Sequence, residues 1–380
     1  MATTVSVAMI VRDEEETLAR ALDSFARHVD EVVVVDTGSV DGTREVARRY
    51  TDQVYEFTWI KDFAAARQYA FDRAHGDWVG HIDADDVVRG AERFRGLAER
   101  APADVGAFCF RYAMGWDDYG HATCEFWRER LVRNDGSYRW HGRVHEVLAS
   151  SKPYREQYNS DVVIEHRPLL REAERPWDHS RRNLEILEAE YEAAGPAADA
   201  RMLFYLAREY ADCGESERAL ELFAEHGRRC RWGDERYQAL LQVAAVHLIR
   251  NEDEAAIDTL LSALKVCPHW PDAYFALARI YYQRQDWHKV IHWTEVGRAM
   301  PQPQTLLFTN PMDYRYNWII YYTNALYHVG DAAAALRWTR AALAICPGDV
   351  MHRQNLAFFK GLEETRPVSE NLTGLTRRDG

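Results

Sequence analysis

The first 90 residues alternate short apolar runs with segments of helical periodicity, and this alternation constrains the fold more than any other feature. Residues 5–11 and 31–36 are continuous apolar runs, as expected for strands that are buried on both faces of a parallel sheet. Each run is followed by a polar turn and then by apolar residues at helical spacing. The pattern predicts an α/β domain with strands at 5–11, 31–36, 54–57 and 78–83 and helices at 17–25, 43–50 and 63–74.

Polar clusters follow three of these predicted strands, at residues 12–14, 36–39 and 83–86. Open parallel sheets bind their ligands at the carboxyl ends of the strands. We therefore expect the three clusters to converge on one crevice, although they lie far apart in the sequence. That crevice is the predicted active site.

The cluster Asp83-Ala84-Asp85-Asp86 is the most acidic of the three. Strand alternation is expected to point Asp83 and Asp85 to the same side. Two carboxylates there would suit Mg²⁺ or Mn²⁺, and such an ion could neutralise a diphosphate leaving group. An acid-rich turn after a strand is also an ordinary solvated turn. The motif by itself leaves both interpretations open.

Four segments place this motif in a wider context. MIVRDEEETL, VVVDTGSVDGT, DFAAARQYA and HIDADD occur in this order and at spacings that resemble glycosyltransferase family 2, over roughly residues 5 to 170. The resemblance implies a GT-A fold, which is an α/β, Rossmann-like domain that binds nucleotide sugars. It further implies a metal-dependent enzyme whose donor is a nucleotide-diphosphate sugar, with a UDP-sugar favoured.

The same resemblance assigns donor-binding roles to individual residues. Arg67 would approach the diphosphate, Asp83 would steady the donor and Asp85 would bind the metal. For Arg67, an ion pair on the helix surface with Asp62 or Asp72 is the competing interpretation. The residues expected to hold the nucleotide base are Val11, Arg12, Glu14 and Asp36. Val11, Arg12 and Asp13 replace the proline-asparagine version that is common in the family.

The acceptor side is expected around the segment YRWHGRVHE, residues 138–146, which resembles the acceptor-site motif of the family. Displacement at an anomeric carbon needs an acidic residue that takes the acceptor proton, and we predict Glu146 as this base. His145 would orient that carboxylate, contact the acceptor or reach the metal, unless it is a packed, hydrogen-bonded histidine. The resemblance to GT-A enzymes also implies that His166, which ends the predicted strand 162–166, is the last metal ligand. An imidazole beside carboxylates favours Mn²⁺ but leaves Mg²⁺ open.

Residues 126–133 alternate arginines with apolar side chains between the metal motif and the predicted base. These arginines could clamp phosphate or an acidic acceptor. They are also typical of the solvated face of an ordinary strand, which is the interpretation we favour. We therefore leave this segment out of the predicted catalytic set. The excluded residues are Phe126, Trp127, Arg128, Arg130 and Arg133.

After Pro168 the sequence takes on a long helical periodicity. Small residues at 219, 256, 290 and 335 recur at intervals of 37, 34 and 45, close to the 34-residue period of tetratricopeptide repeats. The longest interval contains the proline-rich residues 301–314, predicted to be a loop between stacked helix pairs. We expect a catalytic domain at 1–168, a connecting helix at 169–197, about four repeats at 198–365 and a mobile tail at 366–380.

Stacked repeats form an extended concave surface. Here that surface would hold a peptide or protein acceptor, or else serve homodimerisation or support the catalytic domain. A net charge of -13 disfavours binding to nucleic acid. The sequence shows neither a signal peptide nor an apolar stretch of the roughly 20 residues that span a membrane, so we expect a cytoplasmic protein without a transmembrane segment.

The combined pattern resembles the sublancin-type peptide S-glycosyltransferases. It predicts an inverting transfer of a sugar, such as hexose or N-acetylhexosamine from a UDP-sugar, to a Ser, Thr or Cys side chain of a peptide or protein. An alternative from the same fold is transfer to a cell-envelope glycan or lipid. A second alternative is a tetratricopeptide scaffold whose transferase domain is inert.

Overall fold

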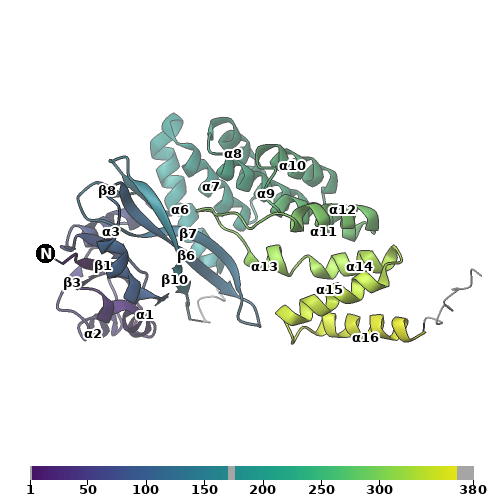
Figure 1. The fold of residues 1–380 in the computed structure, drawn as a ribbon. Helices are drawn as coiled ribbons and strands as arrows, with labels where there is room; N and C mark the ends of the chain where they lie inside the picture. Colours follow the sequence, from purple (N-terminus) through teal and green to yellow (C-terminus); the bar gives the residue numbers. More distant parts are fainter. Residues whose placement is uncertain (1, 170–175, 366–380) are drawn as a thin grey trace, which may run out of the picture. The chain divides into compact units, whose positions relative to one another are not determined.

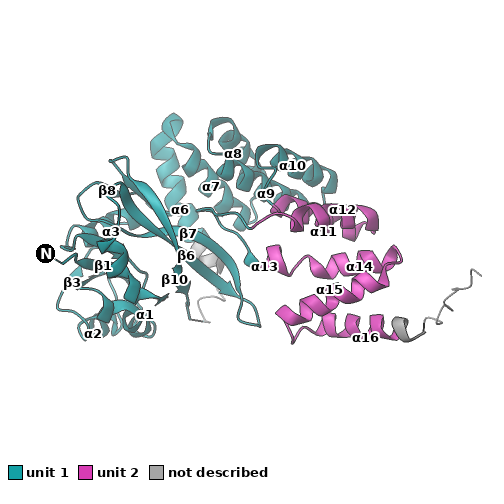
Figure 2. Cartoon of the chain, in the orientation of Figure 1, with its two compact units in different colours: residues 1–270, 302–311 teal, residues 271–301, 312–380 magenta. Residues whose placement is uncertain are grey.

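The computed structural model describes residues 2–169 and 176–365 (Figure 1). They fall into two compact units (Figure 2). Unit 1 comprises residues up to 270 together with 302–311, and unit 2 comprises 271–301 and the residues from 312 onwards. Unit 1 thus extends well past the predicted domain boundary at 168. The predicted tail, 366–380, lies outside the described residues.

The α/β part of unit 1 is built on a mixed sheet. Among the described residues, one sheet of eight strands has the order β3-β2-β1-β4-β7-β6-β10-β5. The first four strands in this order are parallel, and β7 runs antiparallel to both β4 and β6. The strands are β1 (Val5–Val11), β2 (Glu31–Asp36), β3 (Val54–Glu56), β4 (Trp78–His81), β5 (Asp86–Arg89), β6 (Val105–Trp116), β7 (Ala122–Arg133) and β10 (Arg155–His166). Strands β8 (Tyr138–His141) and β9 (Val147–Ser150) form a separate hairpin.

Helices pack on this sheet because the central strands are apolar on both faces. Val7 and Met9 of β1 belong to one buried cluster, whereas Ala8 belongs to another. Helix α1 places Leu18, Leu22 and other apolar residues in the first cluster. Helix α3 begins after Asp62, whose carboxylate accepts a hydrogen bond from the Ala65 amide at 2.8 Å and so caps it. The helices are α1 (Leu18–Phe25), α2 (Thr43–Ala47), α3 (Phe63–Phe71) and α4 (Phe94–Glu99).

Strand β4 is shorter than the sequence predicts. It ends at His81, and Asp83 therefore lies in the turn between β4 and β5. Strand alternation therefore does not reach Asp83 or Asp85. The prediction that it points these two side chains to the same side is wrong. The turn instead gives each aspartate different neighbours.

The helical part is a series of antiparallel pairs, as predicted. A residue with left-handed backbone conformation ends the first helix of each pair, at Gly214, Asn251, Gln285 and Gly330. These positions repeat at the predicted intervals of 37, 34 and 45. After α6 (Pro176–Ala194), the pairs are α7 (Ala200–Asp212) with α8 (Ser216–Arg229), α9 (Gly233–Ile249) with α10 (Asp253–Val266), α11 (Asp272–Gln283) with α12 (Trp287–Arg298) and α14 (Ile319–His328) with α15 (Ala332–Ile345), followed by α16 (Val350–Thr365).

The fold class is therefore confirmed as a GT-A-type α/β domain followed by tetratricopeptide-like helix pairs. The first two pairs belong to unit 1 and the last two belong to unit 2. Acceptor binding and homodimerisation by the repeats both stay predictions. Within the described part of the chain, no helix has the length and apolar character needed to cross a membrane.

The proline-rich segment between α12 and α13 (Pro311–Arg315) does more than connect helices. Residues 302–311, called the strap here, lie along the first part of β7, which β4 does not pair with. The amide of Glu125 donates to the carbonyl of Thr309 at 2.7 Å, and the amide of Thr309 donates back at 2.9 Å. The amide of Trp127 also donates to the carbonyl of Thr305 at 2.9 Å. The predicted loop between stacked helix pairs is therefore an extra edge of the sheet in unit 1.

Candidate active site

The ends of β1 and β2 lie side by side, because the register of the two strands pairs Val11 with Asp36. Asp36 is only 2% exposed, and its carboxylate accepts hydrogen bonds from the amides of Gly38 and Ser39 at 3.2 and 3.1 Å. Gly38 has a φ of 110°, which favours glycine. These hydrogen bonds hold the turn after β2 against the Asp36 carboxylate, which is the group predicted to contact the base.

The turn after β1 carries the remaining residues of the predicted base site. Arg12 is half-exposed, with its Nε 3.7 Å from a carboxylate oxygen of Asp13. The Asp13 carboxylate accepts from the amide of Val40 at 2.8 Å, and the amide of Glu14 donates to Thr43 Oγ1 at 2.7 Å. These bonds fix the β1 and β2 turns to each other. The structure thus brings the four predicted base-binding residues to the adjoining ends of β1 and β2, while their roles stay predictions.

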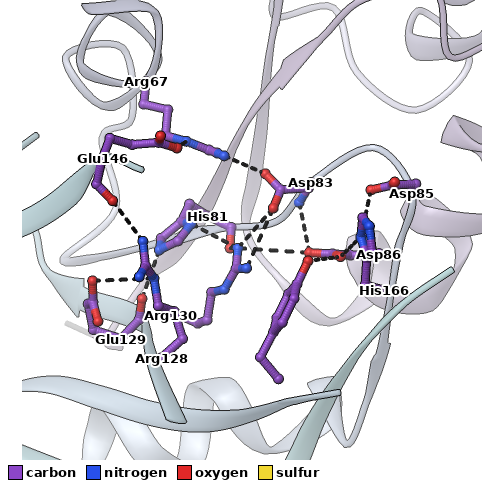
Figure 3. Close-up of polar contacts among 11 residues, drawn as sticks. Arg67, His81, Asp83, Asp85, Asp86, Arg128, Glu129, Arg130, Glu146 and His166 are labelled. Atoms are coloured by element: carbon purple, nitrogen blue, oxygen red, sulfur yellow. Dashed lines mark hydrogen bonds and ion pairs between the residues drawn. The ribbon is translucent and has the colours of Figure 1, made fainter. Parts of the chain in front are cut away.

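Arg67 joins the donor side of the site to the acceptor side (Figure 3). Its Nη2 lies 2.7 Å from Asp83 Oδ1, and its Nε lies 2.5 Å from Glu146 Oε1. The side chain is 12% exposed. The competing interpretation, a surface ion pair with Asp62 or Asp72, is wrong. Asp62 caps α3 instead, and Asp72 pairs with Arg139 at 2.9 Å.

The Arg67 guanidinium sets the charge of both carboxylates. Burial raises the pKa of Glu146, but the charge of Arg67 outweighs it and holds that pKa below its usual range. Burial likewise acts against ionisation of Asp83, while Arg67 and Arg130 hold the pKa of Asp83 well below its usual range. Both carboxylates are therefore ionised at neutral pH, and Glu146 is in the form that can accept a proton.

Arg130 approaches Asp83 from the opposite side. It is 5% exposed, its Nη1 lies 3.4 Å from Asp83 Oδ2, and the guanidinium lies 4.4 Å from the centre of the Tyr112 ring. Its Nη1 also donates to His81 Nδ1 at 3.0 Å. Burial, together with the charge of Arg130, lowers the pKa of His81 well below its ordinary value. The prediction of a solvated strand face at 126–133 is therefore wrong for Arg130.

Asp85, Asp86 and His166 form the group that could hold a metal ion. His166 Nδ1 lies 3.3 Å from Asp85 Oδ1 and 3.4 Å from Asp86 Oδ1, and ligand atoms of all three lie within 4.8 Å of one another. The pairing of β10 with β5 sets His166 opposite Asp86 and so creates this contact. The buried Asp86, which the sequence analysis did not single out as a ligand, also accepts a hydrogen bond from the Tyr112 hydroxyl at 2.8 Å.

The charges of this group fit a divalent cation. Burial lowers the pKa of His166, but the hydrogen bonds to Asp85 and Asp86 outweigh it and raise that pKa to about 10. The two carboxylates thus favour positive charge beside them, even though burial raises the pKa of Asp86 itself, and a cation would take the place of the imidazole proton. Two oxygen donors and one nitrogen donor suit Mn²⁺ or Mg²⁺, with nitrogen favouring Mn²⁺. Metal binding by Asp85 and His166 stays a prediction.

His145 points toward the first helix pair. Its Nε2 lies 2.6 Å from Glu209 Oε1 of α7, and its ring stacks on Tyr205 at 4.2 Å between ring centres. Burial lowers the pKa of His145 despite the carboxylate of Glu209. His145 therefore follows the packed, hydrogen-bonded interpretation in its contacts, although it still lines the site next to Glu146.

Five of the predicted site residues, Arg67, Asp83, His145, Glu146 and His166, line a cavity of about 380 Å³. Its lining does not include Asp85 or the predicted base-binding residues Val11, Arg12, Glu14 and Asp36. The sequence analysis gave no role to much of its wall. Phe63, His81, Trp140 and Val144 lie inside the quoted motifs, and Phe126, Arg128 and Arg130 lie in the arginine alternation. No local motif marks the others. Arg128 adds a hydrogen bond from its Nη2 to the carbonyl of Glu146 at 2.7 Å. The wall residues outside the predicted site are Phe63, His81, Tyr112, Phe126, Arg128, Arg130, Trp140, Val144, Arg182 and Asn183 of α6, Tyr205 of α7, and Leu306 and Phe308 of the strap.

Comparison with known proteins agrees with this geometry, since residues 6–163 match the model of the family described as glycosyl transferase family 2. The chain contains a family 2 glycosyltransferase domain. The match includes every predicted site residue except His166.

Three curated relatives resemble parts of the chain. Glycosyltransferase SunS of Bacillus phage SPbeta is 25% identical over 148 residues, which are 38% of this chain and 34% of the relative. The lipopolysaccharide core biosynthesis glycosyltransferase LpsC of Rhizobium meliloti is 30% identical over 157 residues, 38% of this chain and 56% of the relative. A TPR repeat-containing protein of Synechococcus elongatus is 46% identical over 84 residues, 22% of this chain and 21% of the relative. The chain thus spans from about a fifth to just over half of these relatives.

Proposed function

We propose that the protein is an inverting, metal-dependent glycosyltransferase. It moves a sugar from a nucleotide-diphosphate sugar, with UDP-hexose or UDP-N-acetylhexosamine favoured, to a Ser, Thr or Cys side chain of a peptide or protein. The observation that carries the proposal is the ion-paired bridge from Asp83 through Arg67 to Glu146. This bridge holds an ionised base at a fixed position relative to the turn that would bind the diphosphate.

The residues divide the reaction between them. The Glu146 carboxylate takes the proton of the acceptor hydroxyl or thiol as its oxygen or sulfur bonds to the anomeric carbon. The bond from that carbon to the diphosphate oxygen breaks at the same time, and the diphosphate leaves with the electron pair. Arg67 and Arg130 supply positive charge beside the turn where the leaving group departs. A divalent ion held by Asp85 and His166, with Asp86 behind them, would neutralise further charge on the diphosphate.

The acceptor assignment rests on what surrounds Glu146. Tyr205 comes from a repeat helix and Phe308 from the strap, so the helical part of the chain contributes to the wall of the cavity that Glu146 lines. A wall built from a repeat array suits a peptide or protein acceptor. The resemblance to a lipopolysaccharide core glycosyltransferase supports the competing cell-envelope acceptor, which the second experiment below separates from it.

Donor binding is the first test. Thermal melting is measured with a panel of nucleotide sugars, with and without Mn²⁺. We expect a UDP-sugar with Mn²⁺ to raise the melting temperature, and Asp85→Ala to lose the part of the shift that depends on metal. Asp118→Ala, which removes an exposed carboxylate outside the cavity, is the matched control. Absence of a shift with every donor would contradict the enzyme proposal.

The acceptor is tested in cells that express the protein. Mass spectrometry of total protein should show a peptide whose mass is raised by one sugar, and cells expressing Glu146→Gln should lack it. A change in envelope glycan or glycolipid, with unmodified protein, would instead establish the competing acceptor. If neither modification is found and no donor binds, the remaining hypothesis is a tetratricopeptide scaffold with an inert transferase domain.

A further inference from the structure

A second cavity of about 370 Å³ adjoins the candidate active site in unit 1. It is lined by residues of β6, β7, α7, α9 and the strap, and Phe308 lines both cavities. Its polar lining comes mainly from Arg208 of α7 and from Gln238 and Gln242 of α9. None of these side chains takes part in the mechanism proposed above.

Arg208 has an unusual environment for an arginine. Its guanidinium lies 4.7 Å from the centre of the Phe308 ring and within 6 Å of the Phe204 and Tyr205 rings. The Nη1 atom is buried and has no hydrogen-bond partner among the described residues. A buried donor without a partner is unfavourable, and more so when it is charged, which favours a ligand that supplies an acceptor.

Glu209 and Asp212 lie close enough to sense the Arg208 charge, and Glu209 Oε2 is a buried acceptor without a partner, but neither acid forms an ion pair with Arg208 within 4.0 Å among the described residues. Glu209 Oε1 is occupied by His145 at 2.6 Å and by Asn183 at 3.2 Å. The cavity therefore holds a cation whose strong hydrogen-bond partner, a carboxylate, is not supplied by the chain itself.

The strap keeps Phe308 fixed between the two cavities. The Phe308 carbonyl accepts a hydrogen bond from Gln238 Nε2 at 3.1 Å, and its ring packs edge-on against Phe126 at 4.7 Å. Phe126 itself lines the active site. A ligand that passes the Phe308 ring would therefore touch both cavities at once.

We propose that the second cavity is an acceptor subsite for an acidic residue of the acceptor peptide. The carboxylate of an Asp or Glu near the glycosylated residue pairs with Arg208, and the Gln242 amide offers a further donor. This inference rests on the proposed function, because it names a feature of the peptide that Glu146 deprotonates. The chain selects its acceptor through a charge that lies outside the reacting residue.

The probe is a synthetic peptide pool with a central Ser, Thr or Cys and randomised flanking residues. The pool is incubated with the full-length protein, Mn²⁺ and the donor identified by melting, and glycosylated peptides are sequenced by mass spectrometry. We expect Asp and Glu to be enriched about tenfold at one flanking position with the wild-type protein. Arg208→Gln should abolish this enrichment and Arg208→Lys should retain part of it.

Two controls keep the result decisive. Arg218→Gln removes an arginine that pairs with Glu221 on α8, outside the cavity, and should leave the enrichment unchanged. Donor hydrolysis without peptide, which does not use the subsite, should be equal in all variants and shows that each one is folded. Absence of hydrolysis in the wild type would contradict the proposed function itself. Hydrolysis with no acidic preference, with a preference that survives Arg208→Gln, or with no peptide glycosylated would overturn the subsite.

Discussion

The donor side and the acceptor side of the candidate site are built from very different stretches of sequence. On the donor side, the strand-end turns come from the first 90 residues, and their own backbone amides satisfy their carboxylates, as at Asp36. The acceptor side combines β7 with α6, α7 and the strap, so its wall spans residues from Phe126 to Phe308. The difference teaches that local hydrogen bonding fixes the donor turns, whereas tertiary packing shapes the acceptor wall. Variants can test that division.

Arg67→Met should have the largest effect, because Arg67 is where the two sides meet. Its loss would leave Asp83 with only Arg130 nearby and Glu146 without its ion pair, at a cost of about 3–5 kcal/mol in the free energy of unfolding. Burial would then raise the pKa of Glu146, so the acid limb of the pH–rate profile should move to higher pH. Urea unfolding and the pH profile of donor hydrolysis measure both. An unchanged profile would separate Glu146 from the base role.

Glu146→Gln should lower sugar transfer by about 10³-fold while donor affinity is retained, because the amide keeps the shape but cannot accept the proton. The wild-type pKa of Glu146 lies below the unfolded value of 4.5. The ion pair therefore stabilises the wild type above that pH, and the stabilisation is lost as pH falls through the lower folded pKa. The variant should lack this component of acid unfolding. A transfer rate within tenfold of the wild type would show that another group acts as the base.

Asp36→Asn should act on the donor side alone. The amide keeps one acceptor for the turn but loses the charge expected to contact the base, so we expect the nucleotide Kd to rise about tenfold. The KM for the acceptor should stay the same. Asp52→Asn, at an exposed position of the same domain, is the control. An equal effect on donor and acceptor would break the proposed division between the two sides.

Thr309→Val should have the smallest effect and concerns the acceptor side. It removes the hydrogen bond from Thr309 Oγ1 to the Glu125 carbonyl at 2.7 Å, while the backbone bonds of the strap remain. We expect a loss of about 1 kcal/mol, together with faster hydrogen exchange at the amides of Glu125 and Trp127. Thr259→Val, which removes a 2.7 Å bond to Ala255 inside α10, should leave those amides unchanged. Unaltered exchange in Thr309→Val would show that the strap does not depend on this bond.

The sequence alone predicted the donor side well. The strands at 5–11 and 31–36 have the predicted bounds, because continuous apolar runs ending in polar turns are a strong local signal. It predicted less of the metal turn. β4 ends at His81, and the position of Asp86 depends on the pairing of β5 with β10, in which the paired residues are 74 to 80 positions apart.

Little of the acceptor side could be predicted from the sequence. The alternation at 126–133 suggested a solvated face, but Arg130 is buried because carboxylates and aromatic rings from distant segments surround it. The strap gave no signal of sheet pairing, since its contacts with β7 are backbone hydrogen bonds that almost any residue can make. His145 could be placed near Glu146, yet its partner Glu209 lies in a repeat helix with no motif to mark it.

The strap also bears on the order in which the protein becomes active. The chain leaves unit 1 after residue 270 and returns to it at residue 302. Synthesis proceeds from the amino end, so the donor turns can fold early, whereas Leu306 and Phe308 reach the cavity only after residue 311 has emerged from the ribosome. A chain truncated at residue 270 would keep every predicted site residue and still lack one wall. Acceptor recognition would therefore become possible only after the ribosome has synthesised the third helix pair and the strap.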